Sequence, residues 1–390
     1  MVEKDSEVVL YMNASKLTPE AMAHLEGAKV KLRPYGAIFD DLKSRRSGLE
    51  KTHEKMLISS TCNAALVERL GVENIESQRS PIEKTKAIKN KTEQEGLRKC
   101  HIRDAAALVR YLAWLEAQLQ NGTDIDEVSG SDKLESFRAE NEHFKGLSFD
   151  TISGSGPNGA IIHYKANRAD GNVRKITTKE LYLCDSGAQY LDGTTDVTRT
   201  LHFGEPTTEE KDSFTRVLLG HISLDRVVFP VGTTGLMLDS LARMHLWQVG
   251  LDYRHGTGHG VGHYLNVHEG PQSISFHPRS QETPLLDGMT ITNEPGFYLD
   301  GKFGIRIENV LLVQSAVTRN NFGGTKFLRF ENLTMVPIQT KLIDLTLMTD
   351  KDVDWVNAHH EKCWKAVSPL LQHDQLALDW LHRETRPITK

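Results

Sequence analysis

Apolar residues recur at two different spacings along the chain, and these spacings predict the helices and the strands. Between Leu97 and Leu119 they return every three or four positions, which is the period of a helix with one buried face. Thr92 and Glu95 have the spacing of a capping box at the start of this helix, and Asn121-Gly122 is a typical end. The same period predicts three further helices, over residues 125–140, 208–227 and 235–247.

Short β-rich runs alternate with helical stretches in the first 80 residues, which predicts a partial α/β domain there. These runs are Val8–Met12, Val30–Leu32 and Met56–Ser59. A basic stretch, Lys84–Lys91, follows them. Because uncharged residues interrupt it and acidic residues flank it, we interpret it as a solvated domain boundary and not as a surface for nucleic acid.

The rest of the chain has the order helix, helix, strands twice. Hairpin patterns near Leu181–His202 and Met289–Val313 each follow a pair of predicted helices, and a further strand is expected at Ala160–Tyr164. No sequence repeat accompanies this order, so we predict an α+β domain whose two halves surround one site. The chain looks helical again from Leu342. The predicted domains are therefore residues 1–80, 81–340 and 341–390, the last being a helical extension of the second.

Composition narrows the possible classes of function. The net charge is −5 and the pI is near 6.4, so the chain lacks the overall positive field that attracts nucleic acid or anionic membranes. No apolar run is long enough to span a membrane, and charges occupy the place of a signal segment at the amino terminus. The four cysteines form no CxxC, which argues against disulfides and thiolate zinc sites. We expect a globular cytoplasmic protein.

Four acidic residues interrupt otherwise apolar strands, and they are Asp185, Asp196, Glu294 and Glu308. A buried carboxylate must be paired or bound to a cation, because removing an unpaired charge from water is very unfavourable. Arg199 and Arg306 lie on the same strands, so a network of ion pairs remains an alternative. A metal site is the interpretation that we favour.

The second hairpin pattern is expected to bring two of these carboxylates together. Asp300-Gly301 is a typical turn dipeptide. A two-residue turn there places Glu294 opposite Ile307, and a single bulge then aligns Glu294 with Glu308.

In the first hairpin pattern, an ordinary two-residue turn does not bring the two acidic residues together. A two-residue turn at Asp192-Gly193 pairs Gln189 with Asp196 and leaves Asp185 too far away to share one ion. We therefore predict a wider turn or a bulge around Gly187, which brings Asp185 and Asp196 onto one face.

Histidines are concentrated between His245 and His277, and His255, His259 and His263 recur every four positions, as ligands on a helix do. Alternate residues from Gly256 to Gly262 are glycines, however, and each glycine costs about 1 kcal/mol inside a helix. This segment is therefore predicted to be a loop or a bent strand. Neither HExxH nor GxGxxG fits the chain.

Four carboxylates with one or two histidines form an oxygen-rich set of ligands. Such a set suits hard divalent ions, of which Mn²⁺ is the expected one and Zn²⁺ or Co²⁺ are alternatives. Two ions balance four negative charges. A pair of metals can share a bridging hydroxide that is a nucleophile at neutral pH, so the predicted reaction is hydrolysis.

The chain carries four motifs in this order: DSGAQYLDGTTDVTRT, HGTGHGVGHYLNVHEGP, NEPGFY and GIRIENVLLV. Together they resemble the pita-bread metallopeptidases, and among these the Xaa-Pro aminopeptidases of the large eukaryotic cytosolic type. The resemblance covers about residues 80–390. It implies a pita-bread catalytic domain with pseudo-two-fold halves, in which a hydroxide bridging two metals attacks the bond between the first residue and a following proline.

The resemblance also assigns metal ligands. It implies that Asp185 binds one metal, that Asp196 and Glu308 bridge both metals, and that His259 and Glu294 bind the other.

Further roles follow from the same resemblance. Glu294 would also orient or deprotonate the bridging water, and His268 would stabilise the tetrahedral intermediate. His163 and His255 would line the substrate pocket and shuttle protons, and Arg306 would hold a carboxylate that bridges the metals. No such role is expected for His263, which we interpret as structural, and Tyr298 is a weaker candidate beside Arg306.

The large cytosolic members have two domains before the catalytic one. The resemblance therefore implies that this chain is N-terminally truncated, and that the full-length protein is a homodimer. Peptides with proline at the second position are the expected substrates, and neither nucleic acid nor a membrane is an expected partner. Two alternatives remain open, a prolidase that cleaves Xaa-Pro dipeptides and a non-catalytic pita-bread binding scaffold.

Overall fold

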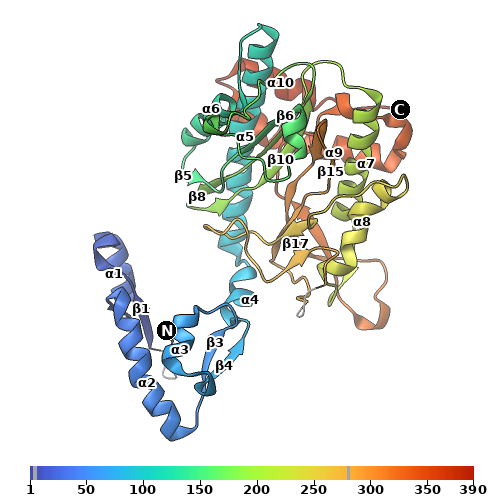
Figure 1. The fold of residues 1–390 in the computed structure, drawn as a ribbon. Helices are drawn as coiled ribbons and strands as arrows, with labels where there is room; N and C mark the ends of the chain where they lie inside the picture. Colours follow the sequence, from blue (N-terminus) through green and yellow to red (C-terminus); the bar gives the residue numbers. More distant parts are fainter. Residues whose placement is uncertain (3–6, 279–281) are drawn as a thin grey trace. The chain divides into compact units, whose positions relative to one another are not determined.

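A computed structural model describes residues 1–2, 7–278 and 282–390. These residues form two compact units, Met1–Glu83 and Lys84–Lys390 (Figure 1). The second unit contains every candidate site residue named from the sequence. Among the described residues, no helix is both long enough and apolar enough to cross a bilayer.

The first unit contains two pairs of parallel strands. β1 (Val8–Tyr11) pairs with β2 (Val30–Arg33), and β3 (Met56–Ser59) pairs with β4 (Ile75–Gln78). Its helices are α1 (Pro19–Gly27), α2 (Ile38–Thr52) and α3 (Ala64–Leu70). A helix connects the strands of each pair, as parallel pairing requires. The three strands predicted in this region are confirmed.

The second unit begins with a long helix. After α4 (Pro81–Ala87), the chain enters α5 (Lys91–Gln120) (Figure 1). The Asn90 side chain accepts a hydrogen bond from the Glu93 amide, and the Glu93 carboxylate accepts one from the Asn90 amide. The capping box predicted two residues later, at Thr92 and Glu95, is therefore wrong. Asparagine caps a helix at least as well as threonine, and the acidic residue three positions after it completes the box.

Two small antiparallel sheets follow α6 (Glu127–Ala139), with the strand orders β10-β7-β6 and β5-β8-β9. The strands are β5 (Phe144–Leu147), β6 (Ile152–Ser155), β7 (Leu181–Ser186), β8 (Ala188–Tyr190), β9 (Gly193–Thr194) and β10 (Val197–His202). The strand predicted at Ala160–Tyr164 is wrong, because Gly156–Ala160 forms a 3₁₀ helix and the strand precedes it. The chain turns back sharply here: a Cβ atom on Gly154 would lie 2.8 Å from the Gly159 backbone.

The second half of this unit repeats the order. α7 (Thr208–Asp225) and α8 (Gly235–Trp247) precede a four-stranded sheet with the order β11-β18-β17-β14. Its strands and those of two short pairs are β11 (Phe229–Pro230), β12 (Gly258–His259), β13 (Ser273–Ile274), β14 (Thr290–Asn293), β15 (Gly296–Leu299), β16 (Phe303–Arg306), β17 (Asn309–Ala316) and β18 (Phe327–Asn332). β10 and β15 lie between α5 on one side and α7 on the other (Figure 1), and the predicted arrangement of two α+β halves is confirmed.

The C-terminal region is helical, as predicted, and it contributes to the cores of both halves. It contains α9 (Asp350–Val367) and α10 (Gln375–Glu384). Val367 and Trp380 pack in one apolar cluster with residues of α5, whereas Val356 packs in another with Phe214 and Val217 of α7. α9 therefore fixes the two halves to one another through buried apolar contacts.

A buried neutral histidine of α9 is expected to make the fold sensitive to acid. Burial lowers the pKa of His360 to about 4, and the His360 ring accepts a hydrogen bond from the Ile338 amide. The unfolded state binds the proton from about pH 6.5 downwards, so stability is complete above this pH and falls as the pH decreases. Between pH 7.5 and 5, His360→Gln is expected to lose about 2 kcal/mol less than the unsubstituted chain. Urea unfolding at both pH values measures this difference, and equal losses would contradict it.

Candidate metal centre

The turn of the first hairpin lies one residue earlier than predicted. Tyr190 faces Gly193, which leaves Leu191-Asp192 as a two-residue turn. Neither a wider turn nor a shift of register is needed to bring the acids together. Gly187 instead marks the point where the ladder passes from one sheet to the next, and a Cβ atom on it would lie 2.0 Å from the Thr195 carbonyl oxygen.

This register places both acids of the hairpin on one face. Asp185 on β7 faces Thr198 on β10. Asp196 precedes Thr198 by two residues, so its side chain is the diagonal neighbour of Asp185 on the same face. The expectation of one shared face is confirmed, although the predicted cause of it is wrong.

The second hairpin places its two glutamates directly opposite each other. Leu299 faces Phe303, which leaves a three-residue loop in which Gly301 has a φ of +74°. A three-residue loop with glycine in the left-handed conformation shifts the register by one residue relative to a two-residue turn. The same register continues into β14 and β17, so Glu294 stands opposite Glu308, as predicted.

The glycine-rich histidine segment is a loop that contains the two-residue strand β12, and it is not a helix, as predicted. β12 lies against β14 so closely that a Cβ atom on Gly258 would be 2.0 Å from the Thr292 carbonyl oxygen. Only glycine permits this approach. The approach brings His259 beside Glu294, because Glu294 follows β14 directly in the chain.

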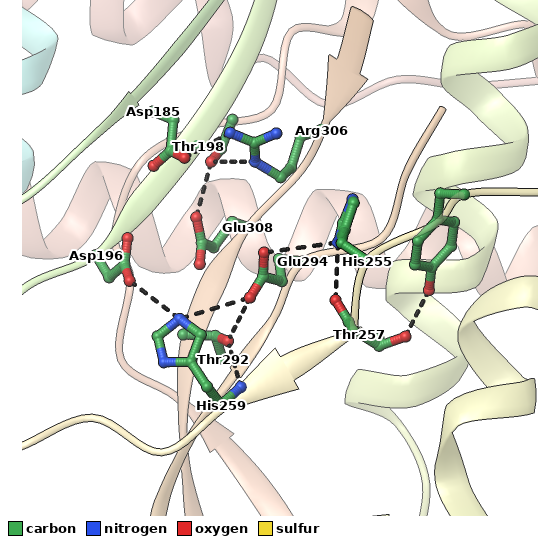
Figure 2. Close-up of polar contacts among 12 residues, drawn as sticks. Asp185, Asp196, Thr198, His255, Thr257, His259, Thr292, Glu294, Arg306 and Glu308 are labelled. Carbon is green, nitrogen blue, oxygen red and sulfur yellow. Dashed lines mark hydrogen bonds and ion pairs between the residues drawn. The ribbon is translucent and has the colours of Figure 1, made fainter. Parts of the chain in front are cut away.

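The carboxylates and His259 converge on one point (Figure 2). Asp196, His259 and Glu308 each offer a ligand atom, and these atoms lie within 4.8 Å of one another. His259 Nε2 is 3.4 Å from Asp196 Oδ2 and 3.5 Å from Glu294 Oε1. The other oxygen of Glu294 is 4.0 Å from His255 Nδ1. Side chains from four separate segments therefore form one polar cluster.

Arg306 connects Asp185 with the opposite side of the cluster. Arg306 Nη2 donates to Asp185 Oδ2 at 2.5 Å, and Nη1 donates to the Tyr298 hydroxyl at 2.7 Å. This hydroxyl lies 2.9 Å from His255 Nε2. The resemblance implied that Arg306 holds a carboxylate shared by both metals, but in the structure the carboxylate that it contacts is Asp185. Arg306 precedes Glu308 by two residues, yet its long side chain reaches across to β7.

Arg199 does not pair with a carboxylate of the cluster. Its guanidinium donates to the main-chain carbonyls of Glu308 and Val336, both at 2.7 Å, and to the Asn309 side chain at 2.8 Å. Among the described residues, arginine therefore compensates one of the four acids, Asp185. A network of arginine ion pairs does not account for the cluster.

The cluster carries more negative charge than its surroundings neutralise. Burial, together with the charge of Asp185, raises the pKa of Asp196 to about 7. Burial and the neighbouring Asp196 and Glu294 raise the pKa of Glu308 well above its usual range. Burial disfavours the proton on His259, but the hydrogen bond with Asp196 and the charge of Glu294 outweigh it and raise the pKa to about 9. Such crowding of acids is typical of a functional site.

The cluster forms one wall of a cavity of about 690 Å³. A cavity of this size accommodates a short peptide. His163, His255 and His268 are among the residues that line it. The ring of His268 packs edge-on against His259, with the centroids 4.3 Å apart. His263 is not among the lining residues, and its Nε2 atom lies against Gly96 of α5.

The donor set fits divalent cations. Asp185 Oδ1 is buried and has no hydrogen-bond partner within the described part of the chain. An orphaned carboxylate oxygen is costly unless a cation completes its environment. Together with the oxygens of Asp196, Glu294 and Glu308 and one imidazole, it makes a set of ligands suited to hard or intermediate metal ions.

Two threonines that the sequence candidates did not include hold the carboxylates in place. Thr292 Oγ1 donates to Glu294 Oε1 at 3.1 Å and accepts from the His259 amide at 2.9 Å. Thr198 Oγ1 donates to Glu308 Oε2 at 2.7 Å. Thr292 precedes Glu294 by two residues and Thr198 follows Asp196 by two, so each shares a strand face with an acid. The alternation of side chains between the two faces of a strand could therefore have identified both threonines from the sequence.

Thr198→Val is expected to weaken the binding of a divalent cation about tenfold, which is within the range for loss of a group that orients a metal ligand. Thr198 Oγ1 also accepts from Arg306 Nε at 3.2 Å, so valine breaks the link between Arg306 and Glu308 and leaves a buried oxygen without its donor. Titration of metal-free protein with Mn²⁺ measures the loss. Thr198→Ser retains the hydroxyl and should retain most of the affinity. Equal losses in both variants would contradict this account.

The two halves around one acidic cluster define the pita-bread fold. A protein-family model described as "Metallopeptidase family M24" matches residues 95–315. Two further models match, "C-terminal region of peptidase_M24" over residues 326–388 and "Creatinase/Prolidase N-terminal domain" over residues 1–93. The chain belongs to metallopeptidase family M24.

Relatives from fungi and a solved nematode structure are similar over nearly the whole chain. A protein of Laccaria bicolor named probable Xaa-Pro aminopeptidase P is 55% identical over 98% of this chain and 59% of its own length. X-prolyl aminopeptidase from Caenorhabditis elegans, described as a cytosolic enzyme with a di-nuclear active site, is 40% identical with a TM-score of 0.91, covering 98% of this chain and 62% of its own. Prolidase from Pyrococcus furiosus is 26% identical with a TM-score of 0.61, covering 84% and 87%. The chain thus spans about 60% of the length of the curated relatives that it matches.

Proposed function

We propose that this chain carries the catalytic site of a metal-dependent Xaa-Pro aminopeptidase, which removes the first residue from peptides whose second residue is proline. The observation that carries the proposal is the group of four carboxylates and His259 on the wall of a peptide-sized cavity. The names of the fungal relatives and of the nematode structure support the same activity.

The proposed ligands of two divalent cations are Asp185, Asp196, His259, Glu294 and Glu308. Asp185 would help to hold one cation, and His259 and Glu294 the other, with Asp196 and Glu308 contributing to both. When bound, the cations supply the charge that polarises the scissile carbonyl and lowers the pKa of a water molecule. Oxygen ligands favour Mn²⁺ over Zn²⁺ or Co²⁺. The di-nuclear site named for the nematode enzyme supports the number of ions.

Side chains of the cavity are proposed to carry out the proton transfers. Glu294 accepts the proton of the attacking water, because its carboxylate lines the cavity and burial raises its pKa, which favours a proton on it. His268 donates a hydrogen bond to the carbonyl oxygen as negative charge develops there. His163 and His255 exchange protons with the substrate, and Arg306 keeps Asp185 oriented.

A prolidase is the second candidate, because the prolidase of Pyrococcus furiosus shares the fold. Its identity to this chain is 26%, compared with 40% for the nematode aminopeptidase, and the nematode structure matches more of the chain. We therefore favour the aminopeptidase. The five ligand-type side chains argue against a non-catalytic scaffold. A cytoplasmic location and a homodimer of the full-length protein also belong to this proposal, and the former is supported by the description of the nematode enzyme as cytosolic.

Product analysis by mass spectrometry tests the proposal. Metal-stripped protein, with or without added Mn²⁺, is offered the tripeptides Ala-Pro-Ala and Ala-Ala-Ala and the dipeptide Ala-Pro. Manganese-dependent release of alanine from Ala-Pro-Ala, without cleavage of Ala-Ala-Ala, is the expected result. Cleavage of the dipeptide alone would identify a prolidase. No cleavage by protein that binds less than one Mn²⁺ per chain would favour the scaffold.

A further inference from the structure

A buried ion pair on α8 lies behind the segment that carries His255. Asp239 and Arg243 are one helical turn apart, and Arg243 Nε lies 2.7 Å from Asp239 Oδ2. Each residue is 1% exposed. Removing two charges from water is so unfavourable that the attraction within one pair seldom exceeds it. The pair therefore needs an explanation other than the stability of α8.

The Arg243 guanidinium makes five hydrogen bonds, and three of them hold the segment before the cluster. Nη1 donates to the Tyr253 carbonyl at 2.6 Å and to Asp252 Oδ1 at 2.9 Å, and Nη2 donates to the His255 carbonyl at 2.7 Å. The guanidinium carbon also lies 3.8 Å from the centroid of the Tyr253 ring. This combination of a cation over an aromatic ring and several donors in a fixed plane is specific to arginine, because lysine offers a single donor centre.

Asp239 holds the other end of the same segment. Thr257 Oγ1 donates to Asp239 Oδ1 at 2.6 Å. An ionised carboxylate only accepts, so the single hydroxyl proton of Thr257 points to Asp239. The Tyr253 hydroxyl, 2.6 Å from the same Oγ1 atom, must then donate to it. The direction of every hydrogen bond from Tyr253 to Asp239 is thereby fixed.

The segment held by Asp239 and Arg243, residues 252–257, in turn contacts two groups of the candidate site. Thr257 accepts a hydrogen bond from the Glu294 amide through its main-chain carbonyl at 2.8 Å, and His255 Nε2 meets the Tyr298 hydroxyl. The contacts of Arg243 and Asp239 therefore lie on both sides of His255 in the chain. Neither Asp239 nor Arg243 lines the cavity.

We propose that Asp239 and Arg243 are positioning residues, which set the place of the His255 ring and of the Glu294 backbone in the active site. The proposal rests on the proposed function for its effect on turnover, since that function gives His255 and Glu294 the proton transfers. The positions of the His255 ring and of the Glu294 backbone can be tested without measuring turnover. The pair acts through the carbonyl of His255 and through Thr257, without touching the substrate.

Arg243→Lys tests the proposal, because lysine keeps the positive charge and loses the planar set of donors. The first readout is the imidazole ¹⁵N resonance of His255 in metal-free protein, identified as the signal that is lost in His255→Gln. We expect this signal to shift or broaden. The second readout is steady-state cleavage of Ala-Pro-Ala with Mn²⁺, in which kcat should fall about 10- to 100-fold while KM stays within about threefold, since a misplacement of about 1 Å costs up to a hundredfold in rate.

Arg138→Lys is the matched control. Arg138 is as deeply buried as Arg243, and it pairs with Asp104 through two hydrogen bonds of 2.9 Å, but it does not line the cavity. Loss of the paired hydrogen-bond donors of a buried guanidinium should lower the stability of both variants. The His255 signal and kcat should remain unchanged in Arg138→Lys. A merely structural role for Arg243 predicts that the two variants behave alike.

If Arg243→Lys does not fold, two smaller substitutions at Thr257 test the proposal instead. Thr257→Val removes the hydroxyl that binds Asp239, and Thr257→Ser restores it, so the His255 signal should move in the first and return in the second. An unmoved signal in folded Arg243→Lys, or in Thr257→Val, would overturn the proposal. A moved signal in a protein whose parent chain cleaves no peptide would uphold the positioning and count against the proposed function.

Discussion

Glu308→Gln is expected to lower kcat/KM for an Xaa-Pro-Yaa tripeptide by about 10³-fold or more, and to leave at most one Mn²⁺ bound per chain. Glu308 is 2% exposed, and its carboxylate lies in the cluster with Asp196 and His259. Glutamine keeps the shape but offers one acceptor oxygen and no charge, so it cannot be shared between two cations as a carboxylate can. Steady-state kinetics and elemental analysis of dialysed protein measure the two effects.

Glu331→Gln is a suitable control for this substitution. Glu331 lies on β18, the neighbour of β17, and its half-buried carboxylate pairs with Arg98. Activity and metal content should be unchanged in this variant. If Glu308→Gln retained two ions per chain, the proposed sharing of Glu308 between them would be wrong.

The sequence predicted the residues of the cluster better than the hairpins that bring them together. Glu294 and Glu308 were expected to meet after one shift of register, and the loop containing Gly301 supplies it. Asp185 and Asp196 were expected to need a wider turn or a bulge, but a turn one residue earlier is sufficient. A turn dipeptide indicates that a turn is near, whereas its exact position depends on how β8 pairs with β5, which is a tertiary contact.

The contacts of long side chains were beyond prediction from sequence spacing. Arg306 lies two residues from Glu308 on one strand, which suggested a contact with a shared carboxylate. Its guanidinium instead reaches Asp185 on a strand 121 residues away in sequence. The alternation of residues along a strand reveals which face of the sheet a side chain occupies. The partner of an arginine on that face depends on which strands the fold places opposite it. Thr257 and Asp239 were missed for the same reason, since helix α8 and the histidine segment meet only in three dimensions.

In the absence of metal, Glu308→Gln is expected to be more stable than the unsubstituted chain, by about 2 kcal/mol at pH 7.5. Burial and the nearby carboxylates raise the pKa of Glu308 well above its usual range. Folding at this pH must therefore either bury the charge of Glu308 or keep a proton on it, and both are unfavourable relative to the ionised residue in the unfolded chain. Glutamine has neither cost, and its amide can donate to the neighbouring Asp196. Urea unfolding in the presence of a chelator measures the difference.

Saturating Mn²⁺ is expected to reverse this order. Ions that bind only the folded state stabilise it by about 2.7 kcal/mol each at 100 times the dissociation constant. The unsubstituted chain gains this for two ions, whereas Glu308→Gln gains it for at most one, and so becomes the less stable protein. Glu331→Gln should follow the unsubstituted chain in both conditions. If Glu308→Gln were the less stable protein even with chelator, the carboxylates would be compensated by the fold itself, and the cluster would not need cations to neutralise it.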